Sequence, residues 1–157
     1  MNKTVVKPSD HLTIDFNKIG VLIINLGTPE GTDYFSMRKY LREFLSDRRV
    51  VDVFRPLWWL ILNGPILTFR PSKSGKAYDK IWNKSKGSPL RYITESQTKK
   101  LQSAYKKYKY IKVEYAMRYG SPSIKSQLNK LFDNGCSKIL LLPLYPQYAA
   151  STTASVQ

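Results

Sequence analysis

Three short segments of the chain have the hydrophobic pattern of β-strands. Residues 19–26 and 139–144 are apolar almost throughout, without regular polar alternation, and residues 111–118 form a further strand candidate. Continuous apolar runs of this length are typical of parallel strands that are covered on both faces. The pattern therefore predicts three strands, of which the first and the third lie in the interior of a sheet.

Helical spacing of apolar residues fills the segments between these strands. Apolar positions three and four apart predict helices over residues 33–45, 74–82 and 94–108. A further helix begins at Ser121-Pro122, as N-cap and first helical residue, and ends at Asn134-Gly135.

Three of these helices have a predicted apolar side, which in the 33–45 helix contains Tyr34, Met37, Leu41, Phe44 and Leu45. In the 94–108 helix that side is formed by Leu101, Tyr105 and Tyr108, while its lysines lie on a solvated face. In the last helix the buried stripe is predicted to contain Ile124, Leu128, Leu131 and Phe132.

The order of elements predicts an α/β fold, with a parallel sheet flanked by helices and right-handed crossovers. Residues 1–17 are polar and irregular, which predicts a flexible tail before a single domain over residues 18–157. A sheet of three parallel strands leaves both edges open. We therefore expect an incomplete domain that continues in a longer chain or pairs with something else.

The segment from Leu57 to Phe69 is apolar on all sides. Pro56 suits the first turn of a short helix, and Asn63-Gly64-Pro65 interrupts the apolar run. One interpretation is a core helix. The other is a pocket lip or a membrane-facing patch, because several arginines lie nearby: Arg48, Arg49, Arg55 and Arg70.

Composition adds a charge constraint. The 157 residues carry a net charge of +15, which favours an anionic partner such as nucleic acid, an acidic membrane surface or a polycarboxylate. A compositional bias toward Lys, Ile, Asn and Tyr explains the charge equally well. The lone Cys136 excludes an intrachain disulfide and predicts a buried, inert thiol in a reducing compartment. Without a signal peptide or a membrane-length apolar run, we expect a cytoplasmic protein.

Several catalytic patterns are absent from the sequence. It contains neither the glycine fingerprint of dinucleotide-binding folds nor a phosphate-binding loop. One cysteine and one histidine cannot build a Cys/His metal cluster, and we interpret His11, in the tail, as a surface residue. Residue spacing alone gives no complete catalytic set.

Five sequence blocks occur in a fixed order along the chain. They are Asn25-Leu26-Gly27-Thr28-Pro29, residues 40–47 (YLREFLSD), Gly87-Ser88-Pro89-Leu90, Met117-Arg118-Tyr119-Gly120 and residues 142–148 (LPLYPQY). Together they resemble the amino-terminal half of the ferrochelatase family, over about residues 18–156.

The resemblance implies a fold and an activity. Ferrochelatases are lyases that insert ferrous iron into protoporphyrin IX, the terminal step of haem biosynthesis. Their chelatase-like (Rossmann-like) fold pairs two similar α/β domains with four parallel strands each, and the porphyrin lies in the cleft between them. The enzyme bends the macrocycle out of plane, and a base removes two pyrrole protons before the metal enters.

The resemblance also implies roles for individual residues. Four match family positions that hold the porphyrin propionates: Arg70, Lys73, Tyr78 and Ser88. Carboxylate binding suits an arginine and hydroxyl donors, although ordinary surface polarity is the alternative. Arg118 and Tyr119 match residues that line the pocket near the ring centre. Leu26 matches a pocket residue that is Met in some relatives, so the apolar contact is kept without sulfur.

Other matches are less informative. Tyr148 matches an aromatic residue near the metal route, with a packed loop tyrosine as the alternative. Residues 57–69 correspond to a pocket lip that is thought to touch the membrane supplying the substrate. This implies possible peripheral contact with the inner face of an anionic membrane.

The metal-site His and Glu of the family lie beyond Gln157, so no metal ligand is expected in this chain. We expect the chain by itself to be inactive, to need a carboxyl-terminal partner half, and to require no cofactor of its own. It stays open whether an iron–sulfur cluster was ever present downstream of this chain.

Two alternatives to an enzyme half remain. One is a non-catalytic porphyrin- or haem-binding module. The other is a basic nucleic-acid-binding domain, which needs basic and aromatic residues on one face. The sequence argues against the second, because the aromatics around Trp58, Trp59 and Phe69 lie apart from the lysines of residues 94–109.

Overall fold

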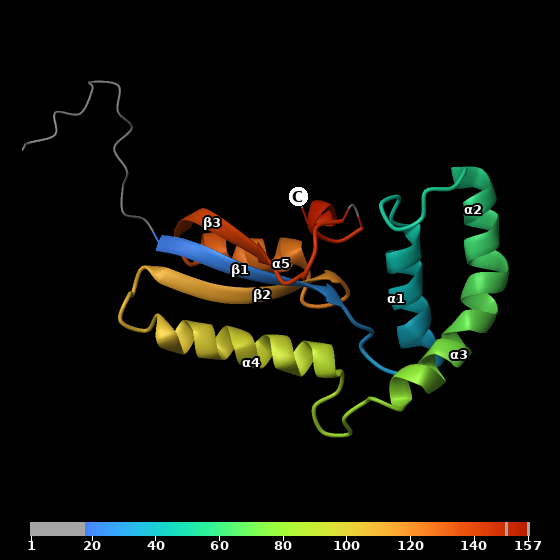
Figure 1. The fold of residues 1–157 in the computed structure, drawn as a ribbon, viewed down its shortest axis with the longest axis horizontal. Coiled ribbons are helices and arrows are strands. Elements are labelled where there is room, and N and C mark those ends of the chain that lie inside the picture. The colour runs from blue at the N-terminus through green and yellow to red at the C-terminus, as the bar shows by residue number, and fades with distance from the viewer. Residues whose placement is uncertain (1–17, 150, 157) are drawn as a thin grey trace, which may run out of the picture.

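The computed structural model describes residues 18–149 and 151–156. Their centre is a sheet of three parallel strands: β1 (Lys18–Gly27), β2 (Ile111–Tyr119) and β3 (Cys136–Pro143). The strand order is β2-β1-β3, so β1 is the central strand (Figure 1). The predicted α/β class and all three strands are confirmed.

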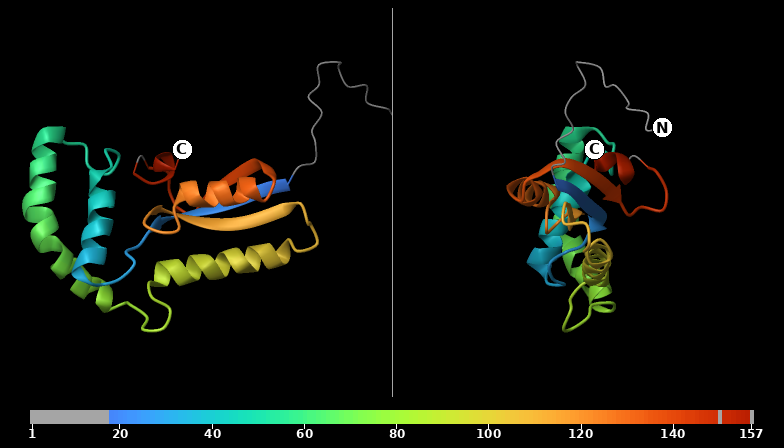
Figure 2. Two further views of the ribbon diagram at one scale, coloured as in Figure 1. Left: turned by 180° about the vertical axis from the view of Figure 1, so that it is seen from behind. Right: turned by 90° about the vertical axis from the view of Figure 1, so that its left-hand side faces the viewer.

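Helices cover the two faces of the sheet unequally. Helix α4 (Pro89–Ala104) packs across β2 and β1 on one face, and α5 (Ile124–Asp133) packs on the other (Figure 2). Beneath α5 lies a core of six buried residues: Leu22, Ile24, Ala116, Leu131, Cys136 and Val156. Burial raises the pKa of the Cys136 thiol, as expected for an inert cysteine.

The prediction that both apolar runs are doubly covered is right for β1 and wrong for β3. Leu22 and Ile24 of β1 are fully buried, whereas Leu140 of β3 is 55% exposed and its neighbours Leu141 and Leu142 are also exposed. The reason is position, because β3 is an edge strand and α4 does not extend over it. At the other edge, the Gln102 side chain accepts a hydrogen bond from the Val113 N–H of β2.

Three helices form a unit beyond the carboxyl ends of the strands, which we call the helical arm (Figure 1). It contains α1 (Tyr34–Ser46), α2 (Arg55–Ile61) and α3 (Leu67–Asp79). Asp33 caps α1 by accepting hydrogen bonds from two backbone N–H groups. The arm has its own core of buried residues, namely Met37, Leu41, Leu45, Leu62 and Leu67.

The predicted interruption at Asn63-Gly64-Pro65 bends the helix instead of ending it. A π-helical turn, Leu62–Ile66, joins α2 directly to α3, with non-helical backbone angles at Gly64. Leu62 and Leu67, on either side of the bend, are buried in the same core, which holds the two helices together. The helix predicted at 74–82 is therefore only the second half of α3.

The predicted start of α4 is also wrong. The helix begins at Pro89, with Ser88 at the N-cap, and not at residue 94. Its sheet-facing side buries Thr94 and Thr98, while Tyr105 and Tyr108 are 39% and 36% exposed. Threonine fits this position because each hydroxyl donates to a backbone carbonyl one turn earlier.

Two details of α5 differ from expectation. Ser123, not Ser121, is the N-cap, and its hydroxyl accepts from the Ser126 N–H. Pro122 stays in the preceding loop because its carbonyl accepts a hydrogen bond from Met117 N–H. Phe132 is 55% exposed, so it is not part of the buried stripe.

The predicted tail over residues 1–17 and His11 lie outside the described residues. Within the described part of the chain, no helix combines the length and hydropathy needed to cross a bilayer.

Candidate functional site

The carboxyl ends of β1 and β2 meet at a close backbone contact. Gly27 has a φ of +109°, and a Cβ atom at this position would lie 1.8 Å from the Tyr119 carbonyl oxygen. Only glycine fits there. The Tyr40 hydroxyl of α1 donates to the Gly27 carbonyl, and the buried Thr28 hydroxyl donates to Ser88 at 2.7 Å. The first strand end is thus fixed to β2, to α1 and to the start of α4.

Asp47, immediately after α1, fixes the end of β2. Its Oδ2 accepts from Arg118 Nη2 at 2.6 Å and from the Tyr119 hydroxyl at 3.0 Å, and its Oδ1 accepts from the Arg49 N–H at 2.8 Å. The Arg118 guanidinium also lies 4.8 Å from the centre of the Tyr119 ring. One carboxylate therefore orients two side chains at the end of β2.

The protonation of this cluster follows from its contacts. Burial acts to raise the pKa of Asp47, but the Arg49 N–H, the Tyr119 hydroxyl and the Arg118 charge together hold it below its ordinary value. Burial and the hydrogen bond to Asp47 raise the pKa of Tyr119 to about 12. At neutral pH the cluster thus contains a carboxylate, a guanidinium and a neutral phenol.

Two buried polar atoms near this cluster have no hydrogen-bond partner among the described residues. They are Arg118 Nε and the Tyr145 hydroxyl, in the segment after β3. Burial raises the pKa of Tyr145, while the charge of Arg118 acts in the opposite direction. Both atoms can donate a hydrogen bond to a polar group of a ligand.

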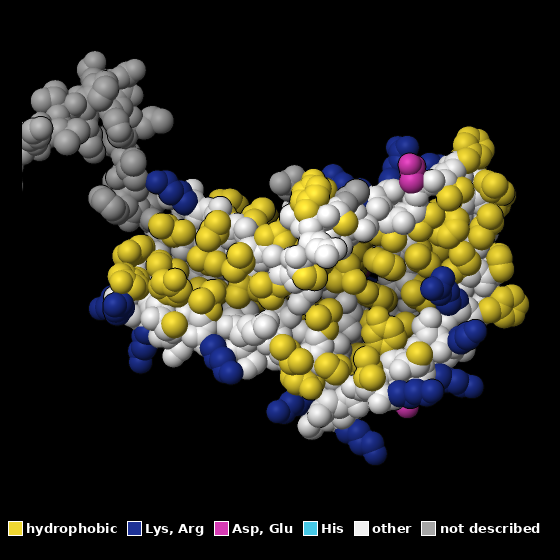
Figure 3. Space-filling model, viewed as in Figure 1, with side chains coloured by type: hydrophobic (Ala, Val, Ile, Leu, Met, Phe, Trp, Pro, Cys, Tyr) yellow, Lys and Arg dark blue, Asp and Glu magenta, His cyan; other side chains and the backbone are white. Residues whose placement is uncertain are grey.

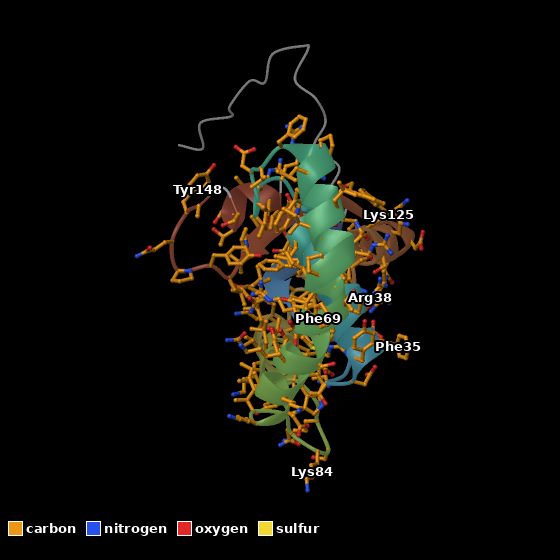
Figure 4. The ribbon with its side chains drawn as sticks, turned by 90° about the vertical axis from the view of Figure 1, so that its right-hand side faces the viewer. Phe35, Arg38, Phe69, Lys84, Lys125 and Tyr148 are labelled. Carbon is orange, nitrogen blue, oxygen red and sulfur yellow. The ribbon has the colours of Figure 1, made fainter. Side chains whose placement is uncertain are left out.

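An open groove of about 600 Å³ runs along α3. Its apolar side is formed by Pro65, Ile66 and Phe69, and Figure 4 shows Phe69 on the outer side of the helix. Arg70 and Lys73 lie in the same lining, three positions apart and therefore neighbours on the helix surface. An apolar wall beside two cations suits a ligand with a hydrophobic body and acidic substituents.

Comparison with known proteins identifies the family. The family model for ferrochelatase matches residues 18–157. The chain belongs to the ferrochelatase family. It is 54% identical over 150 residues to a protein named ferrochelatase from Agrobacterium fabrum, a match covering 95% of this chain and 44% of that protein. Similar proteins of the same name come from Allorhizobium ampelinum (55% identity, 95% and 44% covered) and Rhizobium johnstonii (53%, 96% and 44%). The chain thus spans less than half the length of these ferrochelatases.

The structure brings together two of the four residues expected at the propionates. Arg70 and Lys73 share the α3 groove. Tyr78 instead packs against Tyr40, with ring centres 6.5 Å apart, and Ser88 is buried with its hydroxyl bonded to Thr28. In this conformation, neither side chain lines the groove.

The remaining predicted residues fall at the strand ends. Arg118 and Tyr119 form one cluster with Asp47, as described above. Leu26 is half-buried, and its N–H is bonded by the side chain of the preceding Asn25. Tyr148 is 73% exposed and points away from the molecule in Figure 4, so the interpretation of it as a packed loop tyrosine is wrong.

Sequence reasoning missed Asp47 as a site residue. It ends the block at residues 40–47 that helped to establish the family resemblance, but 71 positions separate it from Arg118. Asp47 could have been found only by carrying the family resemblance over to the last residue of this block. Among the described residues, no cluster of three His, Cys, Asp or Glu side chains could hold a metal ion.

Proposed function

We propose that this chain forms the porphyrin-binding part of a ferrochelatase, an enzyme that inserts ferrous iron into protoporphyrin IX in haem biosynthesis. The observation that carries the proposal is the α3 groove, where an apolar wall adjoins two cations in a chain of this family. Protoporphyrin has the matching chemistry, with a flat apolar ring and two carboxylates.

In this proposal the groove residues divide the work of binding. Ile66 and Phe69 contact the apolar edge of the ring, and Arg70 and Lys73 each bind a propionate. A guanidinium can make two parallel hydrogen bonds to one carboxylate, whereas the lysine ammonium acts as a point charge. These contacts are remote from the pyrrole nitrogens, so their binding energy is available to strain the ring.

The cluster at the end of β2 serves a second purpose. Asp47 holds Arg118 and Tyr119 in fixed orientations before any ligand binds. Preset side chains lose little entropy on binding, so they can support a bent macrocycle at low cost. The Tyr119 hydroxyl already donates its proton to Asp47, whereas the Arg118 Nε–H has no partner among the described residues and can donate to the ligand.

Protoporphyrin titration tests this function. The chain contains three tryptophans, so bound porphyrin should quench their fluorescence. We expect Arg70→Ala to weaken porphyrin binding roughly tenfold, as the loss of one charged hydrogen-bonded contact predicts. Lys76→Ala is the matched control, since Lys76 is an exposed cation of α3 that does not line the groove. Equal affinities for the two variants would remove the groove from the proposal.

A second candidate is porphyrin or haem binding without metal insertion by this chain alone. It is favoured by the extent of the match, because the chain spans only 44% of the ferrochelatase from Agrobacterium fabrum. Anaerobic incubation with ferrous iron and protoporphyrin, followed by haem absorbance, separates the two functions. Haem formed by the chain without a carboxyl-terminal partner would contradict this candidate.

We further propose that α2 contacts an anionic membrane peripherally. None of its residues is buried, and Trp59 and Leu60 are 61% and 62% exposed beside the basic residue Arg55. Figure 3 shows a hydrophobic surface over this part of the helical arm. Exposed aromatic and basic residues together are typical of the membrane interface. This exposure contradicts the interpretation as a core helix for α2, whereas Leu62 and Leu67 of the same apolar segment do belong to the core of the arm.

Liposome co-sedimentation checks this contact. Trp58 is unsuitable for the test because its indole N–H donates to the Leu45 carbonyl at 2.8 Å, which gives it a structural role. We expect Trp59→Ala with Leu60→Ala to lower binding to anionic vesicles several-fold. Phe35→Ala is the control, since Phe35 is 78% exposed at the start of α1. The proposal fails if the double variant sediments with vesicles as the unmodified chain does.

A further inference from the structure

Three tyrosines form a contiguous aromatic surface where α4 leads into β2. The ring centres of Tyr105 and Tyr108 are 6.1 Å apart, and those of Tyr108 and Tyr110 are 5.9 Å apart. Each side chain is between 36% and 45% exposed. Lys107 Nζ lies over the Tyr108 ring, 4.9 Å from its centre, so a planar partner would stack on the remaining exposed parts of the three rings.

Lysines surround these rings. A hollow of about 520 Å³ beside Tyr108 is lined by Lys99, Lys106, Lys109 and Lys112, and no Asp or Glu is part of its lining. Lys99 pairs with Glu95 at 2.6 Å, but the other three are in none of the ion pairs formed between described residues. We call this surface the tyrosine–lysine patch: Tyr105, Tyr108, Tyr110, Lys106, Lys109 and Lys112.

The patch lies at the end of the sheet away from the helical arm (Figure 1). It is thus separate from the α3 groove and from the exposed face of α2. It also corrects the sequence-based argument against nucleic acid, which placed the aromatic residues away from the lysines. That argument considered only the aromatics near Trp58, whereas here tyrosines and lysines share one surface.

We propose that the tyrosine–lysine patch binds single-stranded nucleic acid. Lysines bind successive phosphates as point charges without reading sequence, and exposed tyrosine rings stack on unpaired bases. A bilayer fits less well, because the aromatic residues of the patch are tyrosines packed against one another, and the exposed large apolar residues Trp59 and Leu60 lie elsewhere, on α2. An acidic peptide would use the lysines but would leave the tyrosine faces unexplained.

Fluorescence anisotropy with a labelled oligouridine of about 12 nucleotides tests this proposal. Lys106→Ala with Lys109→Ala should weaken binding at least tenfold. It should also reduce the slope of log K against log salt by about 1.4, the value for two lost phosphate contacts on a single strand. The control is Lys84→Ala with Lys125→Ala, which removes the same charge from exposed sites elsewhere (Figure 4). This control should bind within about threefold of the unmodified chain.

The aromatic contribution is measured separately. Tyr108→Ala should weaken binding about tenfold without changing the salt slope, and Tyr108→Phe should restore it, because stacking needs the ring and not the hydroxyl. Equal losses in the patch and control lysine variants would overturn the proposal in favour of general charge attraction. Absence of oligouridine binding would also overturn it. The proposal would fail as well if Tyr108→Ala weakened binding to polyglutamate or to phosphatidylglycerol vesicles as much as it weakens binding to oligouridine. None of these results bears on porphyrin binding, which is measured without nucleic acid.

Discussion

Strands β1 and β3 look alike in the sequence and differ in the structure. Both contain short runs of large aliphatic residues, yet Leu22 of β1 is fully buried and Leu140 of β3 is 55% exposed. Their carboxyl ends differ as well. The end of β1 is hydrogen-bonded to α1 and packed on β2, whereas β3 continues into a segment where Tyr148 is 73% exposed.

The difference teaches that a hydrophobic run specifies a strand but not its neighbours. Among the described residues, β1 has two neighbouring strands and helices on both faces, while β3 has one neighbouring strand and is open at its other edge. An exposed apolar edge is a liability in an isolated sheet. It is consistent with a chain that spans 44% of its ferrochelatase relatives.

The largest effect is expected at the tight end of β1. Gly27→Ala places a methyl group against the Tyr119 carbonyl in a positive-φ conformation, so we expect a loss of about 4 kcal/mol or more in unfolding free energy. Urea denaturation measures it. Gly31→Ala is the control and should cost much less, because there the nearest atom belongs to the exposed Asp33 side chain. Similar stabilities for the two variants would disprove the close contact.

A pair of leucine truncations compares the two strands directly. Leu22→Ala leaves a cavity in a closed core and should cost about 3 kcal/mol, whereas Leu140→Ala should change stability by only about 0.5 kcal/mol. Chemical denaturation of both variants gives the values. If Leu140→Ala proves as costly as Leu22→Ala, β3 is covered in solution, and self-association would then be sought by sedimentation.

Removing the charge of Asp47 tests how much its hydrogen bonds at the end of β2 contribute to stability. Asp47→Asn should cost about 2 kcal/mol near neutral pH, since it loses charged hydrogen bonds to Arg118 and Tyr119. The pKa of Asp47 is lowered by folding, so its contribution is complete above the ordinary value of 3.8 and is lost as the pH falls below it. The stability difference between the two proteins should therefore shrink below about pH 4.

The control for this prediction is Asp52→Asn, which changes an exposed carboxylate in the loop after α1. It should have little effect at any pH. A difference for Asp47→Asn that stays constant between neutral and acidic pH would show that packing, not charge, causes its effect.

A smaller effect than that of Asp47→Asn is expected at the contact between β1 and β3. A Cβ atom at Gly20 would lie 2.7 Å from Ile139 Cδ1, so Gly20→Ala should cost about 1 kcal/mol. Ile139→Val removes the obstructing atom. The double variant should then be more stable than the sum of the single changes predicts, as a double-mutant cycle would detect. Simple additivity would mean that the two strands do not pack as described.

Two Ser-Pro pairs show the limit of local signals for the fold. Ser121-Pro122 was the predicted helix start and lies in a loop, while Ser88-Pro89, outside the helix predicted at 94–108, is the actual start of α4. For Ser121-Pro122, the hydrogen bond from Met117 N–H to the Pro122 carbonyl keeps the pair in the loop before α5. A competing hydrogen bond from a distant segment cannot be derived from a dipeptide.

The candidate site was predictable only in part for the same reason. Arg70 and Lys73 lie within one helix, so their shared groove follows from spacing once the helix is known. Asp47 and Arg118 come from different elements, and nothing in the local sequence of either indicates the other. Tyr105 and Tyr108 were predicted to be apolar contacts of α4, but the sheet is covered by Thr94 and Thr98 instead.

By itself the sequence determined the α/β class, the three strands, the buried Cys136 and the family, because each depends on composition, local periodicity or ordered motifs. The tertiary structure alone decided that β3 is an exposed edge strand, that α2 continues into α3, and that Asp47 joins Arg118 to Tyr119. The physical reason is that burial and pairing are properties of neighbours in space, and a residue's neighbours in sequence do not specify them.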